Sequence, residues 1–378
     1  MSNPKKASAT NRPAGALILL VPGDPETQTG GYIYDRRIVY GLGRLGWHVD
    51  MYSLDASFPQ PTAPALDHAR GVLAGIPDGQ IVVIDSLALG GLSGLLEAES
   101  ERLCLVALIH HPVALETGLD GETARAFLAS ERASLMFVRR VVVTSPWTSR
   151  KLGEYGVAPD RIRVVSPGVD AMPSGPERQK ARTDIPNRDA VDETSLNLLC
   201  VATLTPRKGH DVLFDALAQL GDRPWHLYCA GSLTRDPSTA DGLRRQIDRL
   251  GLGPRISLLG EVDRGELERQ YARCDVFVLA SHLEGYGMAL AEASARGIPV
   301  VSTLAGAIPE TVPANAGVLV PPGDDRALAQ ALAKLMDDPD ARRRLASSAL
   351  AARKLLPTWS QASRQFGAAL EDLVSSES

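Results

Sequence analysis

Residues 275–302 read DVFVLASHLEGYGMALAEASARGIPVVS, and this stretch decides the fold. The apolar run DVFVLAS is followed by a loop, HLEG, by the helical pattern YGMALAEASARG and by a second apolar run, IPVVS. A strand, a helix and a second strand in this order form a βαβ unit, whose two strands are parallel. Apolar runs without alternation are typical of parallel sheets that helices cover on both faces.

The same alternation continues through the rest of the chain. Strands are also predicted at LNLLCVATL, WHLYCAGSL, RISLLGEV and AGVLVPPGD, and, before residue 170, at GALILLVPG, HVDMYSL, QIVVIDSL, LCLVALIHH, RRVVVTSP and IRVVSPG. The sequence therefore predicts an α/β protein with two Rossmann-like, doubly wound parallel-sheet domains. Because such sheets bind ligands outside the carboxyl ends of their strands, two facing domains would form a cleft lined by strand-to-helix loops.

One segment separates the two series of strands. Residues 172–195 are rich in proline, charge and small polar residues, which is typical of an inter-domain linker. We therefore expect a disordered N-terminus over 1–14, an N-terminal domain over 15–172, a linker over 173–195 and a C-terminal domain over 196–357. A C-terminal helix over 358–378 could cross back to the N-terminal domain.

Composition excludes several classes of function. The chain has 40 Lys and Arg against 45 Asp and Glu, so it lacks the basic balance of a nucleic-acid binder. Its four cysteines are far apart and form no C-x-x-C pair, which favours buried thiols in a reducing compartment. The first residues lack the apolar core of a signal peptide, and no run reaches the roughly 18 apolar residues of a membrane span. We expect a cytoplasmic protein without a nucleic-acid partner, and nothing indicates contact with a membrane surface.

Two short motifs are set aside. GLGRLG, residues 41–46, matches G-x-G-x-x-G but closes a helical pattern and precedes a strand, whereas a dinucleotide site needs the reverse order. DPD, residues 338–340, lies between two helical patterns rather than at the end of a strand. The sequence therefore predicts neither a dinucleotide cofactor nor a bound metal.

Two loops could hold an anion. In VPGDPETQTGGYIYDRR, Gly30 and Gly31 stand just before a helix, where the free N–H groups of the helix attract negative charge. A plain hinge would use the same glycines. In VATLTPRKGHDVL, Arg207 and Lys208 follow a strand and precede a helix, where cations oppose the helix dipole unless a negative ligand shares the site. A diphosphate would explain their placement, although two solvated cations are the alternative.

The opening stretch carries two acids. Glu284 follows a strand, and Glu292 lies about two turns into the expected helix, within an apolar run where an unpartnered charge is costly. Carboxylates suit vicinal hydroxyls, as on a sugar or a ribose, because each oxygen accepts hydrogen bonds. The alternative is that Glu284 only favours the helix dipole and that Glu292 is solvated. The residues between the acids would offer backbone N–H groups to phosphate or sugar oxygens. These residues are Gly285, Tyr286, Gly287 and Met288.

Two histidines end the strand in LIHHPVALETG. Side chains alternate along a strand, so His110 and His111 should not both face one ligand. A histidine at this place could also be a structural residue with satisfied hydrogen bonds.

Several motifs in this order resemble the retaining glycosyltransferase family 4, whose members have the GT-B fold. They are EGYGMALAE with the following GIPVV, then AGAIPETV, AGVLVPPGD and the upstream LTPRKGHDVLFDAL. The resemblance implies that residues 15–172 form the acceptor domain and residues 196–357 the nucleotide-sugar domain.

The resemblance also assigns residues to roles. It implies that Glu284 contacts the donor sugar, Glu292 binds ribose hydroxyls and Lys208 binds phosphate. Gly30 and Gly31 would lie against the diphosphate. The family histidine near the sugar and the reaction centre aligns best with His110.

One position departs from the family. The family has an arginine five residues before the phosphate-binding lysine, and this chain has Thr203 there. Arg207 could stand in, because a guanidinium can engage diphosphate oxygens with two N–H groups.

The resemblance implies an enzyme that moves a sugar from a nucleoside-diphosphate sugar to an acceptor hydroxyl with retention of configuration and without a metal. The donor is a co-substrate, and no cofactor is expected. The sequence names neither the donor base and sugar nor the acceptor, which could be a glycan, a lipid-linked or a small molecule. A sugar-nucleotide epimerase or hydrolase and a silent sugar-nucleotide-binding subunit are the alternatives.

Overall fold

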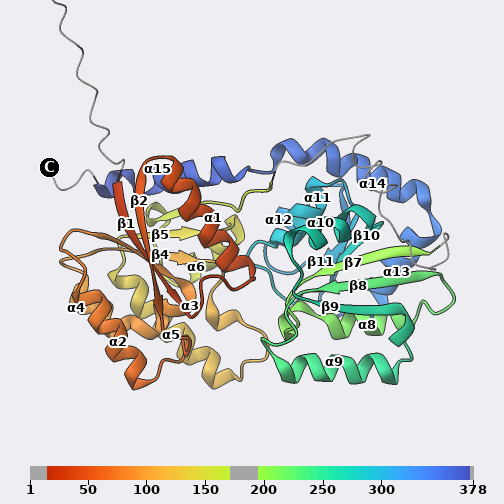
Figure 1. The fold of residues 1–378 in the computed structure, drawn as a ribbon, viewed down its shortest axis with the longest axis horizontal. Coiled ribbons are helices and arrows are strands. Elements are labelled where there is room, and N and C mark those ends of the chain that lie inside the picture. The colour runs from red at the N-terminus through yellow and green to blue at the C-terminus, as the bar shows by residue number, and fades with distance from the viewer. Residues whose placement is uncertain (1–14, 171–194, 375–378) are drawn as a thin grey trace, which may run out of the picture.

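The computed structural model describes residues 15–170 and 195–374, which form two α/β domains joined side by side (Figure 1). The expectations for 1–14, for all but the last residue of the 173–195 linker and for 375–378 lie outside the described residues.

The N-terminal domain contains one parallel sheet with the strand order β2-β1-β3-β4-β5-β6. Every side chain of β3 and β4 is buried, as the unbroken apolar runs predict. The strands are β1 (Gly15–Pro22), β2 (Trp47–Leu54), β3 (Ile81–Asp85), β4 (Cys104–Ile109), β5 (Arg140–Val143) and β6 (Ile162–Val164).

Helices connect these strands in the right order for βαβ units. The helix α1 ends before Gly46, whose φ of +89° only glycine adopts readily, so the GLGRLG motif ends a helix. The helices are α1 (Gly30–Arg44), α2 (Ala63–Ala74), α3 (Ser86–Leu89), α4 (Ser93–Glu99), α5 (Gly121–Phe137) and α6 (Pro146–Glu154), with short 3-10 turns at η1 (Gly90–Leu92), η2 (Val113–Leu115) and η3 (Pro159–Arg161).

The C-terminal domain repeats the architecture with the strand order β12-β11-β10-β7-β8-β9. The strands are β7 (Leu196–Val201), β8 (Trp225–Ala230), β9 (Ile256–Gly260), β10 (Val276–Leu279), β11 (Val300–Thr303) and β12 (Gly317–Val320). The helices are α8 (His210–Ala218), α9 (Pro237–Arg249), α10 (Arg264–Arg273), α11 (Met288–Ala295), α12 (Ile308–Thr311), α13 (Asp325–Asp337) and α14 (Pro339–Ala352), with 3-10 turns at η4 (Pro206–Lys208), η5 (Gly253–Arg255) and η6 (Arg353–Leu355).

The last helix, α15 (Trp359–Val374), runs back along the N-terminal domain and packs against α1 (Figure 1). Its apolar face joins the core on one side of the N-terminal sheet through Ala362, Phe366 and Leu370. Arg140 at the start of β5 forms a bidentate ion pair with Asp372. Its Nη1 donates to Oδ1 at 3.0 Å, and its Nη2 donates to Oδ2 at 2.6 Å. The helix α15 is therefore fixed to the N-terminal domain.

All four cysteines are buried in the two cores. Among the described helices, none combines the length and the apolar character that crossing a membrane requires.

Candidate active site

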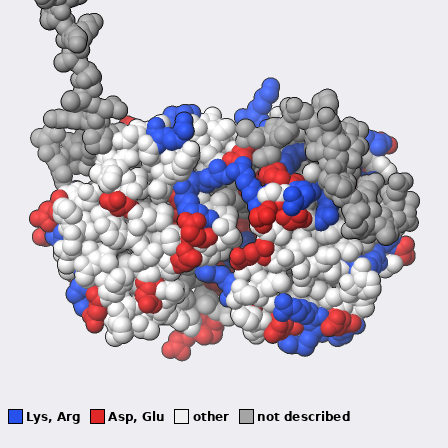
Figure 2. All heavy atoms as spheres, viewed as in Figure 1, with Lys and Arg blue, Asp and Glu red and all other residues white. Residues whose placement is uncertain are grey.

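The carboxyl ends of the two sheets meet at the junction between the domains. The loop after β10 packs directly on the end of β4: a Cβ atom added to Gly285 would lie 2.0 Å from the carbonyl oxygen of His110. The hydroxyl of Thr148, on α6, donates to the carbonyl of Gly285 at 3.3 Å. Position 285 therefore needs a glycine so that the two domains can approach. Figure 2 shows basic and acidic side chains gathered over this junction.

Glu284 and Lys208 form a buried ion pair at the junction. Lys208 Nζ donates to Glu284 Oε1 at 2.6 Å, and the Ser281 hydroxyl donates to the same oxygen at 2.7 Å. Burial raises the pKa of Glu284, but Lys208 and then Arg207 outweigh it and hold this pKa below its usual range. Burial lowers the pKa of Lys208, and the carboxylate opposes that effect. The pair is stable as two ions because each member satisfies the other.

Arg207 bridges the two domains. Its Nε lies 2.9 Å from Oε1 of Glu116, which belongs to the loop after β4, and its Nη1 donates to the carbonyl of Leu283 at 2.9 Å. Glu116 also lies 3.2 Å from Nε2 of His111. Burial raises the pKa of Glu116, but His111 and Arg207 together lower it to about 2. The guanidinium therefore faces an acid of the opposite domain.

Glu292 lies in a different environment from Glu284. The helix α11 begins at Met288, because Gly287 adopts a φ of +93°, so Glu292 lies about one turn into the helix rather than the two turns expected. The Tyr271 hydroxyl donates to Glu292 Oε2 at 2.9 Å. Burial raises the pKa of Glu292, and Arg296 and Tyr271 limit the increase.

The glycine pair opens α1 at the junction. The helix begins at Gly30, and its N-cap residue, Thr29, makes no capping hydrogen bond with its side chain. A Cβ atom on Gly31 would lie 3.2 Å from Cδ2 of His110, and one on Gly30 would lie 3.6 Å from the sulfur of Met288. The first N–H groups of α1 thus lie beside His110 and beside the start of α11 in the other domain.

The remaining residues between the two glutamates have mainly structural contacts. Tyr286 packs with Val169 and Leu356 in a small apolar cluster that joins the domains. Met288 is half-buried against the core of the N-terminal domain.

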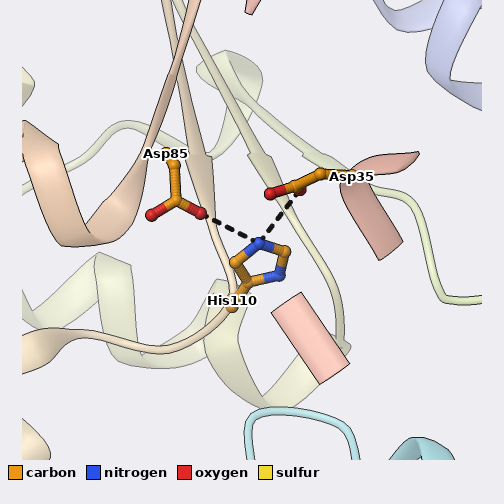
Figure 3. Close-up of side chains that lie close together, drawn as sticks. All are labelled: Asp35, Asp85 and His110. Atoms are coloured by element: carbon orange, nitrogen blue, oxygen red, sulfur yellow. Dashed lines mark ion pairs between the residues drawn. The ribbon is translucent and has the colours of Figure 1, made fainter. Parts of the chain in front are cut away.

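The structure adds a cluster that the sequence did not predict. His110 Nε2 lies 3.2 Å from Asp35 Oδ1 and 3.1 Å from Asp85 Oδ2 (Figure 3). Burial lowers the pKa of His110, but the two aspartates more than offset it and raise this pKa to about 10. Burial raises the pKa of Asp35 to about 6. One nitrogen of His110 and one carboxylate oxygen of each aspartate lie within 4.8 Å of one another, a spacing that could also hold a metal ion.

Two sequence signals point to this cluster. Asp35 shares the buried face of α1 with Ile38 and Leu42, at positions i, i+3 and i+7, where an acid is unusual. Asp85 ends the fully buried strand β3. Their common contact with His110 depends on the order of the strands in the sheet, which the sequence alone does not reveal.

A further cation lies near the glycine loop. The loops after β7 and β8 run side by side, since the N–H of Leu204 donates to the carbonyl of Ser232 at 3.1 Å. Thr203 belongs to the first loop and Arg235 to the second. Arg235 is close enough to the Tyr32 hydroxyl, in the first turn of α1, to oppose the burial and the Asp85 charge that raise the pKa of this hydroxyl to about 12. No motif marks Arg235 in the sequence.

Comparison with known proteins identifies the family. Residues 34–172 match the family described as Glycosyltransferase Family 4, and residues 181–351 match Glycosyl transferases group 1. The chain belongs to glycosyltransferase family 4. This assignment agrees with the resemblance carried by EGYGMALAE and LTPRKGHDVLFDAL.

Curated relatives include two bacterial transferases. A D-inositol 3-phosphate glycosyltransferase of Corynebacterium glutamicum is 31% identical over 234 residues, which are 59% of this chain and 54% of the relative. The chain thus spans about half the length of that relative. An MMP alpha-(1->4)-mannosyltransferase of Mycolicibacterium hassiacum is 28% identical over 334 residues, which are 84% of this chain and 77% of the relative.

Solved structures confirm the fold class. Sucrose-phosphate synthase from Thermosynechococcus elongatus superposes with a TM-score of 0.77 at 23% identity, covering 95% of this chain and 99% of that one. WaaG, a glycosyltransferase involved in lipopolysaccharide biosynthesis, gives a TM-score of 0.70 at 19% identity, with 96% and 100% covered. The predicted GT-B fold, with two facing parallel sheets, is therefore confirmed.

Proposed function

We propose that this protein is a retaining glycosyltransferase that moves a sugar from a nucleoside-diphosphate sugar to an acceptor hydroxyl without a metal. The buried pair of Lys208 and Glu284, which lies at the junction together with His110 and the start of α1, carries the proposal. This arrangement brings a cation, free helix N–H groups and two groups that can bind hydroxyls to the carboxyl ends of both sheets.

The donor diphosphate would bind between Lys208 and the first turn of α1. Gly30 and Gly31 leave room for it, because they place no side chain beside His110 and Met288. Glu292 would accept hydrogen bonds from the ribose hydroxyls. The backbone between Glu284 and Met288 would follow the sugar and the phosphates.

The sugar would contact Glu284 and His110. In the proposed front-face reaction, the bond from the anomeric carbon to the diphosphate oxygen breaks with its electron pair on the diphosphate. The acceptor oxygen forms the new bond on the same face, and its proton passes to the leaving diphosphate. Lys208 and the helix N–H groups would stabilise the negative charge on the leaving diphosphate. We expect this stabilisation to be the largest contribution to catalysis.

The phosphate-binding role of Arg207 is also part of the proposal. Its guanidinium is already paired with Glu116, so a diphosphate would compete with that carboxylate or share the guanidinium with it. Arg235 is a second candidate for the missing family arginine, because its loop adjoins that of Thr203.

A thermal-shift panel of UDP-, GDP-, ADP- and TDP-sugars in excess EDTA tests the proposal, because a ligand that binds the folded state raises the melting temperature. We expect a shift with one nucleotide class and sugar transfer to an acceptor from the same mixture. The free sugar or an isomerised donor, formed with donor alone, would favour an epimerase or hydrolase. Binding without any turnover would favour a silent subunit, and no shift with any donor would overturn the proposal.

A further inference from the structure

One nitrogen of His110 lies between two buried carboxylates. Asp35 comes from α1 and Asp85 from the end of β3, and only 1% and 3% of their surfaces are exposed. Both contact Nε2, at 3.2 and 3.1 Å, and Figure 3 shows the other nitrogen, Nδ1, directed away from both acids. Nε2 itself is buried, so the accessible 16% of the side chain lies on its other atoms. Nδ1 is the nitrogen left for a ligand.

Charge balance favours a cationic ring. The second oxygen of Asp85 accepts the N–H of Leu87 at 2.7 Å, whereas among the described residues His110 is the side chain with which Asp35 pairs. The other titratable neighbours are Tyr32, Tyr34 and Arg36 on α1, and His111. Arg36 donates to the carbonyl of Thr27 at 3.1 Å. Two adjacent buried carboxylates repel each other, and a positive charge on His110 offsets that repulsion.

Packing fixes the direction of the ring. Tyr34 meets it edge to face, with ring centroids 5.4 Å apart, and Gly31 lies against its Cδ2 edge. The backbone is fixed as well, because the Thr144 hydroxyl donates to the carbonyl of His110 at 3.0 Å. The ring therefore has little freedom to exchange Nδ1 for Nε2.

We propose that Asp35 and Asp85 are positioning residues that hold His110 as an imidazolium, so that Nδ1–H donates to an oxygen of the nucleotide sugar. This inference rests on the proposed function. A neutral ring that donates Nε2–H to the aspartates would present only an acceptor lone pair at Nδ1. Two carboxylates convert it into a donor with a full positive charge, which suits a sugar hydroxyl or a phosphate oxygen. The raised pKa of His110, about 10, agrees with this state.

The direct test measures the protonation of His110 without any donor. The chain contains seven histidines, so the ring ¹⁵N signals of labelled protein can be assigned with His110→Gln. We expect both nitrogens of His110 to be protonated at pH 8. In Asp35→Asn and in Asp85→Asn, the titration midpoint should fall by at least one pH unit. Asp50→Asn removes the acid from the exposed His48–Asp50 pair and should leave the His110 midpoint unchanged.

Three results would overturn the inference. A neutral His110 in the wild type at pH 8, or an unchanged midpoint in both variants, would contradict it. If equimolar Zn²⁺ or Mn²⁺ displaces the Nε2 proton, the cluster is a metal site instead. Since these readouts need no donor, they fail independently of the proposed function.

Turnover gives a second test. If transfer is observed, Asp35→Asn should lower kcat about tenfold, because the hydrogen bond from Nδ1–H of His110 to the nucleotide sugar is weakened. The change in KM should be smaller. The alkaline limb of its pH–rate profile should move to lower pH by the same amount as the NMR midpoint. A merely structural aspartate would change the melting temperature without moving that limb, and this result would also contradict the inference.

Discussion

Single residues at the junction are charged and largely buried, so each depends on a specific partner. Glu284 has 7% of its side chain exposed and Lys208 has 17%. Removing one member of such a pair leaves an uncompensated charge, whereas removing both charges avoids that cost. The stability of the site and its affinity for a donor can therefore be separated by mutation.

Lys208→Met should lower the free energy of unfolding by about 3 kcal/mol, because it leaves the buried Glu284 with only the longer contact to Arg207, at 3.6 Å, as a positive partner. Lys208→Met combined with Glu284→Gln should recover most of this loss, yet bind no donor. Urea denaturation of the wild type, Lys208→Met, Glu284→Gln and the double variant measures the effect. Lys151→Met, which breaks a surface pair with Glu154, is the matched control and should change stability by less than about 1 kcal/mol. If the loss of unfolding free energy in the double variant equals the sum of the losses in the two single variants, Lys208 and Glu284 are not coupled.

Glu292→Ala should weaken binding of the selected donor by about 1–3 kcal/mol, since ribose hydroxyls would lose their acceptor. The C-terminal domain should remain folded, because Glu292 is anchored mainly through Tyr271. Calorimetric titration of the donor measures the change. Glu268→Ala, which removes the exposed partner of Arg296, provides a control nearby. Equal affinity in Glu292→Ala and the wild type would refute the ribose assignment.

Among the elements, the helix α5 supports the loop that carries His111 and Glu116. Its residue Glu131 accepts the N–H of Val113 at 2.6 Å and that of Ala114 at 3.2 Å. Burial raises the pKa of Glu131 to about 7, against an ordinary value of 4.5. The protonated form is therefore favoured in the folded chain, and its stabilising effect is lost as the pH rises from about 4.5 through 7.

Glu131→Gln should remove this dependence on pH. Between pH 5 and 7, the free energy of unfolding should fall less steeply in the variant than in the wild type, by up to about 1.4 kcal/mol per pH unit. Denaturant titrations at each pH measure the slope. Glu97→Gln changes an exposed glutamate on the neighbouring α4 and should keep the wild-type slope. Parallel curves for the wild type and Glu131→Gln would argue against a protonated Glu131.

At the scale of the whole molecule, ion pairs join the two domains in addition to the apolar cluster around Tyr286. Arg207 reaches Glu116, Arg150 pairs with Glu310, and Arg264 lies 3.0 Å from Asp170. Ion pairs of this kind can be exchanged for ligand contacts at moderate cost, because part of each is exposed to solvent. A donor that binds Arg207 would therefore change how the domains are joined.

Variants of Arg207 and Thr203 test how the chain replaces the missing family arginine. If Arg207 contacts the diphosphate, Arg207→Ala should reduce transfer by a large factor, similar to that of Lys208→Ala, and Thr203→Arg should change it little. Donor titrations and initial rates for the three variants measure this. If Arg207→Ala leaves transfer unchanged and Thr203→Arg binds the donor more tightly, Arg207 serves only to join the domains.

The sequence predicts the repeated βαβ architecture because apolar runs and helical patterns are local signals. The paired charges at the junction are different. The contact of Glu116 with Arg207 depends on how the two domains face each other, and the contact of Asp35 with His110 depends on strand order. The late start of α11 follows from the left-handed conformation of Gly287, which the letters YG do not dictate. Motifs thus place residues near the site, and tertiary structure pairs them.

The most direct test of the central claim is the anomeric configuration of the product. The selected donor, an α-linked nucleoside-diphosphate sugar, is incubated with an acceptor in excess EDTA, and the anomeric proton of the first product is followed by NMR. We predict an α-linked product and unchanged rates when Mg²⁺ or Mn²⁺ is added. A β-linked product, or transfer that occurs only after metal is restored, would contradict the proposal.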